Sequence, residues 1–316
     1  MATAERVAWY GGAYLPESQV RIPFRDAGAT RGEAAYDSAR TFDGQVFRLG
    51  AHLERLWRSL AYIRIEPPAP MAVVEEISLE VARRNVEIMG DDVWVTQRVT
   101  RGIPAEWGGD GRPSLLVESL PIPFAARAVS FRDGARLLTP TMRRTPPWAL
   151  SPQAKTVDLL NLVLAGREAV ALDPSAWPML TDENGNLAEG AGANVFVVRG
   201  GVLATPQVRY VLDGVTRATV IELARERGIT VEERDIGLFD AYTADEIFIT
   251  STSLCICPVA SLNGVATGAG SVPGPMTKRL QDAFSGLVGM DVVEQYLRRL
   301  PTPINDMGSA TMGDTR

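Results

Sequence analysis

Residues 187–198 read LAEGAGANVFVV, a stretch in which one acidic residue stands among alanines and glycines and leads into an apolar strand. Glu189 is poorly placed for solvation there, and a buried carboxylate is costly unless it is paired. The glycines allow the backbone to approach a flat ligand closely. The stretch indicates either a turn that carries a charge or a carboxylate held for a ligand.

Lysine is scarce in this chain, so chemistry that needs an amine has few candidates. Only two of the 32 basic residues are lysines, Lys155 and Lys278, and His52 is the one histidine. A codon bias toward arginine explains this composition without any function. Lys155 stands between a proline-containing loop and an apolar helical pattern, a position that by itself is typical of a surface residue.

Two segments have the composition of anion-binding turns. Residues 213–217, DGVTR, precede a helical pattern, so free amides and the positive helix end meet there. Residues 250–253, TSTS, follow an apolar strand. Each segment alone is more often an ordinary cap or turn. With Arg55, Lys155 and Glu189 they form the set that pyridoxal 5'-phosphate needs: an amine, a partner for the ring nitrogen and a phosphate clamp.

The length and the pattern of segments predict an α+β protein of two unequal domains. A chain of 316 residues exceeds the usual single core. We place a small α/β domain at residues 1–120 and a larger cofactor-binding domain at 128–300. Prolines suggest a linker at 121–127, and the polar tail at 301–316 is expected to be peripheral.

Hydrophobic periodicity locates the expected elements. Asp43-Gly44 between two strand-like runs predicts a hairpin. Helices are expected over 52–65, 71–89, 157–172, 216–228 and 276–287, and strands over 93–100, 114–120, 177–181, 194–198, 202–205, 246–250 and 256–260.

Charge and composition argue against several classes of partner. A net charge of −6 gives no electrostatic footprint for nucleic acid or an anionic membrane. No apolar run reaches the roughly 20 residues of a membrane span, and we expect a cytoplasmic protein. Cys255 and Cys257 are too close for an ordinary disulfide, and we expect packing or pocket lining there and no metal site.

Taken in order, the motifs resemble the fold type IV pyridoxal-phosphate enzymes, which include D-amino-acid, branched-chain and (R)-selective amine aminotransferases. The resemblance runs from about residue 24 to residue 287. It is carried by FRDAG at 24–28, FRLGAHLERL at 47–56, KTVDLLN at 155–161, EGAGANVF at 189–196, LDGVTR at 212–217, residues 244–259, and GPMTK at 274–278.

The resemblance implies a fold, a cofactor and an assembly. It implies a transaminase with a small α/β N-terminal domain and a larger barrel-like C-terminal domain, with pyridoxal 5'-phosphate between them. Because the family's active site usually borrows a loop from a second subunit, at least a homodimer is expected. The substrates would be a small-molecule amine and a keto acid.

The resemblance also implies roles for individual residues. Lys155 would form the Schiff base and shuttle the proton, and Glu189 would pair with the ring nitrogen. His52 would be structural, and Lys278 matches no catalytic position. The phosphate would be held by Arg55, Val215, Thr216, Thr252 and Ser251, with Leu212 against the ring and Tyr36 lining the substrate pocket.

The substrate-discriminating motifs of the family are missing. Residues 102–109 lack the Arg-x-His pair of D-amino-acid transaminases, and Trp94 and Thr96 stand where branched-chain enzymes have Tyr-x-Arg. Since an arginine fork is the natural receptor for a carboxylate, this departure argues against a dedicated α-amino-acid enzyme.

A hydrophobic primary amine, (R)-configured by the resemblance, is therefore the expected donor. Trp94, Thr96 and Arg98 alternate onto one strand face, where Trp94 and Trp107 would form an apolar wall. The acceptor carboxylate could bind one of three arginines, Arg98, Arg143 or Arg144.

Other interpretations stay open. The enzyme could be a branched-chain or D-amino-acid aminotransferase. A lyase of the aminodeoxychorismate type would eliminate pyruvate and need no keto acid, whereas a transaminase of ping-pong mechanism requires one. A non-catalytic cofactor-binding or assembly protein is the remaining alternative.

Overall fold

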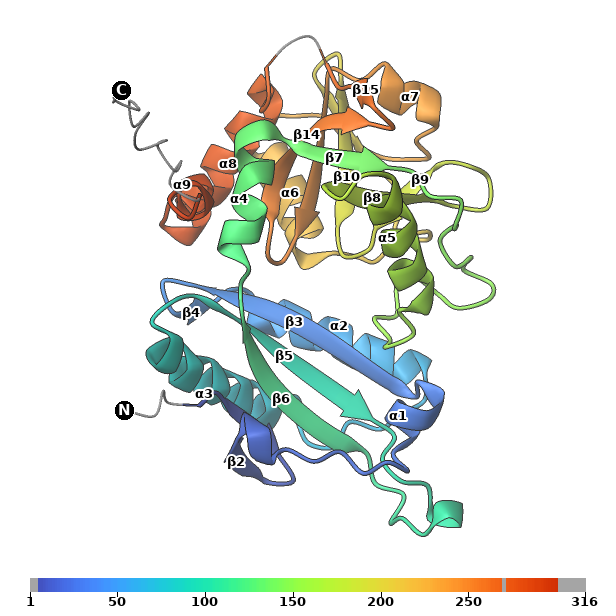
Figure 1. Cartoon of the computed structure of the whole chain (residues 1–316), viewed down its shortest axis with the longest axis vertical. Coiled ribbons are helices and arrows are strands. Elements are labelled where there is room, and N and C mark those ends of the chain that lie inside the picture. The colour runs from blue at the N-terminus through green and yellow to red at the C-terminus, as the bar shows by residue number, and fades with distance from the viewer. Residues whose placement is uncertain (1–4, 269–270, 301–316) are drawn as a thin grey trace, which may run out of the picture.

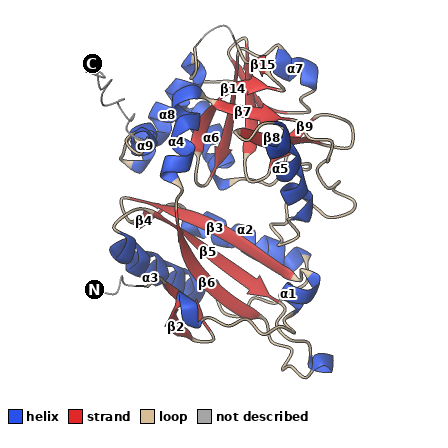
Figure 2. Ribbon diagram, in the orientation of Figure 1, coloured by secondary structure: helices blue, strands red, loops and turns tan. Residues whose placement is uncertain are grey.

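The computed structural model describes residues 5–268 and 271–300, so the predicted tail at 301–316 lies outside the described residues. The chain forms two domains, each built on one sheet (Figure 1). Figure 2 shows that helices accompany the strands in both. Helices and strands are thus mixed in each domain, and the α+β expectation is confirmed. No described helix combines the length and the apolar character that crossing a membrane would require.

The N-terminal domain is a six-stranded sheet in the order β2-β1-β6-β5-β3-β4. Its helices α2 and α3 enclose a core with the sheet residues Ala35, Ala39, Val95 and Val99. Its elements are β1 (Val7–Tyr10), β2 (Ala13–Pro16), η1 (Glu17–Gln19), α1 (Ala27–Arg31), β3 (Ala34–Phe42), β4 (Gln45–Val46), α2 (Leu49–Tyr62), α3 (Met71–Met89), β5 (Val93–Thr100), η2 (Ala105–Trp107) and β6 (Ser114–Pro121).

Strand periodicity places a second set of side chains on the opposite face of this sheet. Across β3 and β5 the paired residues are Tyr36 with Arg98, Ser38 with Thr96, and Arg40 with Trp94. Arg40 reaches residues of the C-terminal domain from this face. The face therefore looks toward the space between the domains.

The C-terminal domain is a nine-stranded sheet that closes on itself. Its strands follow the order β12-β11-β10-β13-β14-β7-β8-β9, with β15 on β14, and β9 pairs back with β10. The closing pair is Glu189 opposite Asn194. Its elements are α4 (Phe124–Asp133), β7 (Ala135–Leu138), α5 (Leu160–Leu172), β8 (Ala176–Thr181), β9 (Leu187–Gly190), β10 (Asn194–Arg199), β11 (Val202–Thr205), α6 (Val215–Glu226), β12 (Val231–Glu233), α7 (Leu238–Tyr242), β13 (Glu246–Ser251), β14 (Cys255–Leu262), β15 (Val265–Ala266), α8 (Pro275–Val288) and α9 (Val292–Leu297).

Most elements lie where the periodicity predicts them. The hairpin at Asp43-Gly44 is present, with both residues at positive φ, as a two-residue turn of this kind requires. Cys255 and Cys257 are buried in the core of the C-terminal domain.

Four α-helices were missed, namely α1, α4, α7 and α9, and one helix begins later than predicted. The helix predicted over 157–172 starts only at Leu160, because the residues before it pair with β3. Helix α9 was not predicted. Neither was α4, although Phe124, Ala128 and Phe131 have helical spacing; the two prolines before them obscured the pattern.

The domain boundaries stay a prediction. In the structure β6 ends at Pro121 and α4 begins at Phe124, so only Ile122 and Pro123 separate these elements within the expected linker at 121–127.

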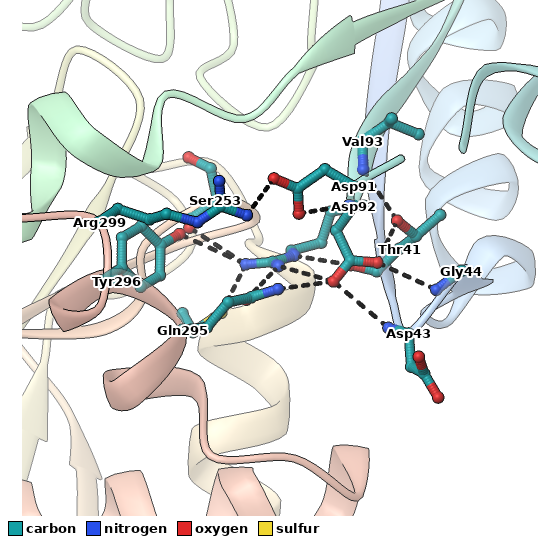
Figure 3. A network of polar contacts seen from close by, with 12 residues as sticks. Thr41, Asp43, Gly44, Asp91, Asp92, Val93, Ser253, Gln295, Tyr296 and Arg299 are labelled. Atoms are coloured by element: carbon teal, nitrogen blue, oxygen red, sulfur yellow. Dashed lines mark hydrogen bonds and ion pairs between the residues drawn. The ribbon is translucent and has the colours of Figure 1, made fainter. Parts of the chain in front are cut away.

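A buried polar network joins the two domains beside α9 (Figure 3). The Asp92 carboxylate, on the N-terminal side, accepts hydrogen bonds from Thr41 Oγ1 at 2.7 Å and from Gln295 Nε2 at 2.6 Å. Arg40 Nη2 lies 3.9 Å from Asp92 and donates to Gln295 Oε1 at 2.8 Å. Because all four side chains are buried, each depends on the others for its polar partners.

The substitution Asp92→Ala is expected to lower the free energy of unfolding by about 3–5 kcal/mol, since it leaves the buried Arg40 charge without its acidic partner. Asp91→Ala is the matched control, because Asp91 pairs with the exposed side chain of Arg299 and should cost less than about 1 kcal/mol. Urea denaturation of the three proteins measures both. Equal losses from the two substitutions would contradict the importance of this network.

Candidate functional site

A cavity of about 830 Å³, including its mouth, lies where the two domains meet. Its walls come from β3, α2, the segment before α5, strands β9 and β10, the start of α6 and the turn after β13. Nine residues predicted for the site line it together: Tyr36, Arg55, Lys155, Glu189, Leu212, Val215, Thr216, Ser251 and Thr252.

Lys155 is held by its backbone rather than by its side chain. Its N–H donates to Ser59 Oγ at 3.0 Å, and its carbonyl accepts from the Tyr36 N–H at 3.0 Å. The amine lies 4.6 Å from the centroid of the Tyr36 ring. Within the described part of the chain Lys155 makes no ion pair, so its amine is free for chemistry.

Arg55 enters the cavity from α2 and is held by a buried carboxylate. Its Nε and Nη2 both donate to Asp37 at 2.7 Å, and Nη1 donates to the Asp213 carbonyl at 2.8 Å. His52 Nδ1 lies 2.7 Å from the same Asp37. Burial raises the pKa of Asp37, but the charge of Arg55 and the contact with His52 outweigh it and hold the pKa below its usual range.

This network was not predicted beyond a structural role for His52. Asp37 lies on the helix-facing side of β3, between Ala35 and Ala39 on the same face of the strand. An acidic residue on this otherwise apolar face is the sequence signal that could have identified it. Its function in the structure is to fix the arginine that faces the cavity.

The first turn of α6 provides unpaired amides at the cavity. The N–H groups that begin a helix have no carbonyl partner within the helix. Gly214 precedes them, and a Cβ there would clash with Asn194 Oδ1, so the close approach requires glycine. Thr250 Oγ1 is buried without a hydrogen-bond partner in the part of the chain that the structure describes. These donors, with Arg55, form the anion-binding end of the cavity.

Glu189 is buried in the wall of the cavity with its charge compensated. Oε1 accepts from Arg144 Nε at 2.6 Å, and Oε2 accepts from the Leu212 N–H at 3.0 Å. Asn194 Nδ2 donates to the Leu212 carbonyl at 2.9 Å and so fixes the same segment. The functions of Arg144 and Asn194 were missed, because neither contact is local in sequence.

The three arginines considered for a substrate carboxylate all have other partners. Arg98 donates to Glu118 at 3.1 Å, Arg143 to the Asp182 carbonyl at 2.8 Å, and Arg144 to Glu189. This weakens each of them as a carboxylate receptor.

The apolar wall around the substrate stays a prediction, and one chain does not assemble it around Lys155. Trp94, Thr96, Arg98 and Trp107 do not line the cavity around Lys155. Thr96 Oγ1 bonds Ser38 Oγ at 2.8 Å, and the Trp94 ring contacts Arg127 instead of Trp107. Trp107 lies on the loop between β5 and β6, which extends away from the sheet (Figure 1), and its ring stacks on Arg31.

Known proteins share this architecture. A family model described as amino-transferase class IV matches residues 34–262. The chain is 34% identical to the "Putative branched-chain-amino-acid aminotransferase" of Methanocaldococcus jannaschii, over 88% of this chain and 95% of that protein. It is 29% identical to a D-alanine aminotransferase of Bacillus licheniformis, over 88% and 96%. The solved T.th. branched-chain amino acid aminotransferase with pyridoxamine 5'-phosphate has a TM-score of 0.79 at 27% identity, over 94% and 98%.

The cavity fits pyridoxal 5'-phosphate, the cofactor of this family. The unpaired Thr250 hydroxyl, the amides of α6 and the Arg55 guanidinium suit a phosphate. A free lysine amine and a buried carboxylate complete the donor set that the cofactor requires.

His52 gives the folded protein a distinct pH dependence. Burial lowers the pKa of His52 below its ordinary value of 6.5, although Asp37 opposes this. The folded state therefore keeps His52 neutral while the unfolded state takes up a proton below about pH 6.5. Above that pH, His52 is neutral in both states and does not reduce the free energy of unfolding. Below it, the free energy of unfolding is expected to fall by up to about 1.4 kcal/mol per pH unit.

Denaturation between pH 5 and 7.5 measures this slope, and His52→Gln should remove it. His52 is the only histidine, and no other side chain has an unperturbed pKa in the window. An unchanged slope in His52→Gln would assign the effect to another group.

Proposed function

The chain belongs to the class IV aminotransferases and is a pyridoxal-phosphate-dependent enzyme, and we propose that it transfers the amino group of a hydrophobic primary amine of (R) configuration to a keto acid or ketone. One observation carries the proposal: both arginines that line the cavity are already paired, Arg55 with Asp37 and Arg144 with Glu189. A donor without a carboxylate suits such a cavity. The configuration follows from the resemblance to the (R)-selective amine transaminases.

The wall beside the lysine segment supports an apolar donor. Leu150, Pro152, Leu159 and Leu162 line the cavity there. Their side chains offer a substrate no hydrogen-bond partner, and burial of an alkyl or aryl group against them is favourable by about 25 cal/mol per Å² of apolar surface.

Different residues of the cavity would hold different parts of the cofactor in the proposed reaction. When bound, pyridoxal 5'-phosphate supplies the carbonyl that exchanges amines and an electron sink for the carbon that loses its proton. Arg55, Val215, Thr216, Ser251 and Thr252 would hold its phosphate, and Leu212 would pack against its ring. Glu189, hydrogen-bonded to Arg144 and to the Leu212 N–H, would face the ring nitrogen.

Lys155 is the base in this proposal. Its backbone is fixed by hydrogen bonds with Ser59 and Tyr36, so only the side chain that carries the amine has to move during the reaction. The amine removes the proton from the substrate carbon and returns it on the other side of the transfer. We propose two half-reactions of ping-pong type, in which the donor leaves as a ketone before the acceptor binds.

A branched-chain aminotransferase is the second candidate. The 34% identical archaeal relative carries that name and matches 95% of its own length. In that case an α-carboxylate must bind without a free arginine on the cavity wall.

The absorbance of the purified holoenzyme tests the donor. The band of cofactor bonded to Lys155 should bleach with (R)-1-phenylethylamine, and should persist with its (S)-enantiomer, with L-leucine and with D-alanine. Bleaching by L-leucine instead would favour the branched-chain candidate. Lys155→Ala is the control; it should lose both the band and turnover, and full activity in this variant would reject the lysine assignment.

We also propose that the chain forms a homodimer through helix α5 and the loop before it. Leu160 and Leu172 of this helix are 68% and 72% exposed, and Trp148 of the loop is 81% exposed. Large apolar side chains gathered in this way are typical of a protein interface.

The double substitution Leu160→Glu and Leu172→Glu should convert the dimer to monomer, because it would bury carboxylates in the interface. Leu79→Glu is the control, since Leu79 is an exposed leucine on α3, away from this surface. Sedimentation velocity measures the mass of each protein. A wild-type monomer, or a double variant that stays dimeric, would reject this interface.

A further inference from the structure

Arg127 occupies an unusual position between the two domains. It projects from α4, and its Nη1 donates to Ser253 Oγ. The guanidinium carbon lies 5.2 Å from the ring centroid of Trp94 in β5 and 5.8 Å from that of Trp177 in β8. One indole comes from each domain, so the cation sits at their junction.

The charge of Arg127 has no acidic partner. Within residues 5–268 and 271–300, ten arginines make no ion pair: Arg21, Arg25, Arg64, Arg127, Arg143, Arg167, Arg199, Arg209, Arg279 and Arg298. Arg127 is the one of these ten that is not exposed. Burial lowers its pKa, which the Tyr296 hydroxyl and the Cys257 thiol only partly offset. A partly desolvated cation of this kind is stabilised by an anion.

The turn after β13 connects Arg127 to the cavity. Ser253 Oγ, which accepts from Arg127, is 3.4 Å from Ser251 Oγ. Ser251 and Thr252 both line the cavity around Lys155. The guanidinium is therefore bonded to the Ser253 end of a turn whose residues Ser251 and Thr252 line the cavity.

Most of the hydrogen-bonding capacity of Arg127 is unused. A guanidinium has five N–H donors, and the acceptors found for it among the described residues are two hydroxyl oxygens, those of Ser253 and Tyr296. An aromatic ring over the face of a guanidinium leaves the N–H groups at its edge available. A carboxylate can accept two of them side by side.

We propose that Arg127 is the receptor for the carboxylate of the acceptor keto acid. This inference rests on the proposed function, and it answers the question that Arg98, Arg143 and Arg144 left open, since each of those has another partner. The apolar donor uses the wall beside the lysine segment, and the acceptor places its carboxylate at the Ser253 end of the turn.

The acceptor half-reaction tests Arg127 without involving the donor. Wild-type protein, Arg127→Met and Arg127→Lys are loaded with pyridoxamine 5'-phosphate and mixed with pyruvate or with acetaldehyde, which is pyruvate without its carboxylate. Arg199→Met is the control, since Arg199 is an exposed arginine at the end of β10 without an ion pair among the described residues. Melting temperatures report whether each variant is folded.

Arg127→Met is expected to raise the pyruvate concentration for half-maximal rate by about ten- to a hundred-fold, the usual loss for a charge-assisted hydrogen bond. Arg127→Lys should lie between it and wild type, because lysine keeps the charge but not the fork. Acetaldehyde should react with all variants within about two-fold. Equal losses for both acceptors, or none for pyruvate, overturn the proposal.

Calorimetry gives a second measurement that does not depend on turnover. Propionate should bind wild-type holoenzyme and Arg199→Met, and should bind Arg127→Met at least about ten-fold more weakly. Propionamide, its uncharged analogue, should not distinguish the variants. If wild-type protein turns over neither a keto acid nor a ketone, the proposed function is wrong, while propionate titration still decides whether Arg127 binds a carboxylate. Equal propionate affinity in Arg127→Met rejects that role.

Discussion

Two backbone hydrogen bonds tie the lysine segment to the edge of β3. The Tyr36 N–H donates to the Lys155 carbonyl, and the Val157 N–H donates to the carbonyl of Ala34. They extend the sheet of the N-terminal domain with residues that belong to the C-terminal part of the chain. Because the backbone is fixed in this way, the Lys155 amine and the Tyr36 ring meet at the junction, and helix α5 can begin only after the paired residues. The cavity exists between domains because this pairing closes one side of it.

Compensation of buried charge organises the rest of the site. Arg55 is matched by Asp37, and Glu189 is matched by Arg144 and by the Leu212 N–H. Each pairing makes the charged group less available to bind a substrate, since a buried ion that loses its partner is strongly destabilising. Arg127, for which the described residues provide no carboxylate partner, differs from this pattern, and its guanidinium lies against the indoles of Trp94 and Trp177.

The closing pair of the C-terminal sheet links fold and chemistry directly. Glu189 in β9 lies opposite Asn194 in β10, where the sheet returns on itself. The same two side chains hold the N–H and the carbonyl of Leu212, which lies three residues before α6 begins. Barrel closure, the carboxylate and the anion-binding end of the cavity are thus parts of one hydrogen-bonded unit. This coupling explains why a glycine is required at position 214, where a side chain would clash with Asn194.

The sequence alone determined the α+β class, most element positions and nine cavity residues, because periodicity and short motifs such as those at Lys155, Glu189 and Gly214 are local. It did not reveal the partners of those residues: Asp37 for Arg55, Arg144 for Glu189 and Asn194 for Leu212 come from distant segments. It also placed Trp94 and Trp107 in one wall, whereas within one chain the Trp94 ring contacts Arg127 and the Trp107 ring contacts Arg31. Tertiary structure decided these points, because the pairing of buried charges depends on which distant segments of the chain come into contact. Local sequence patterns do not specify those contacts.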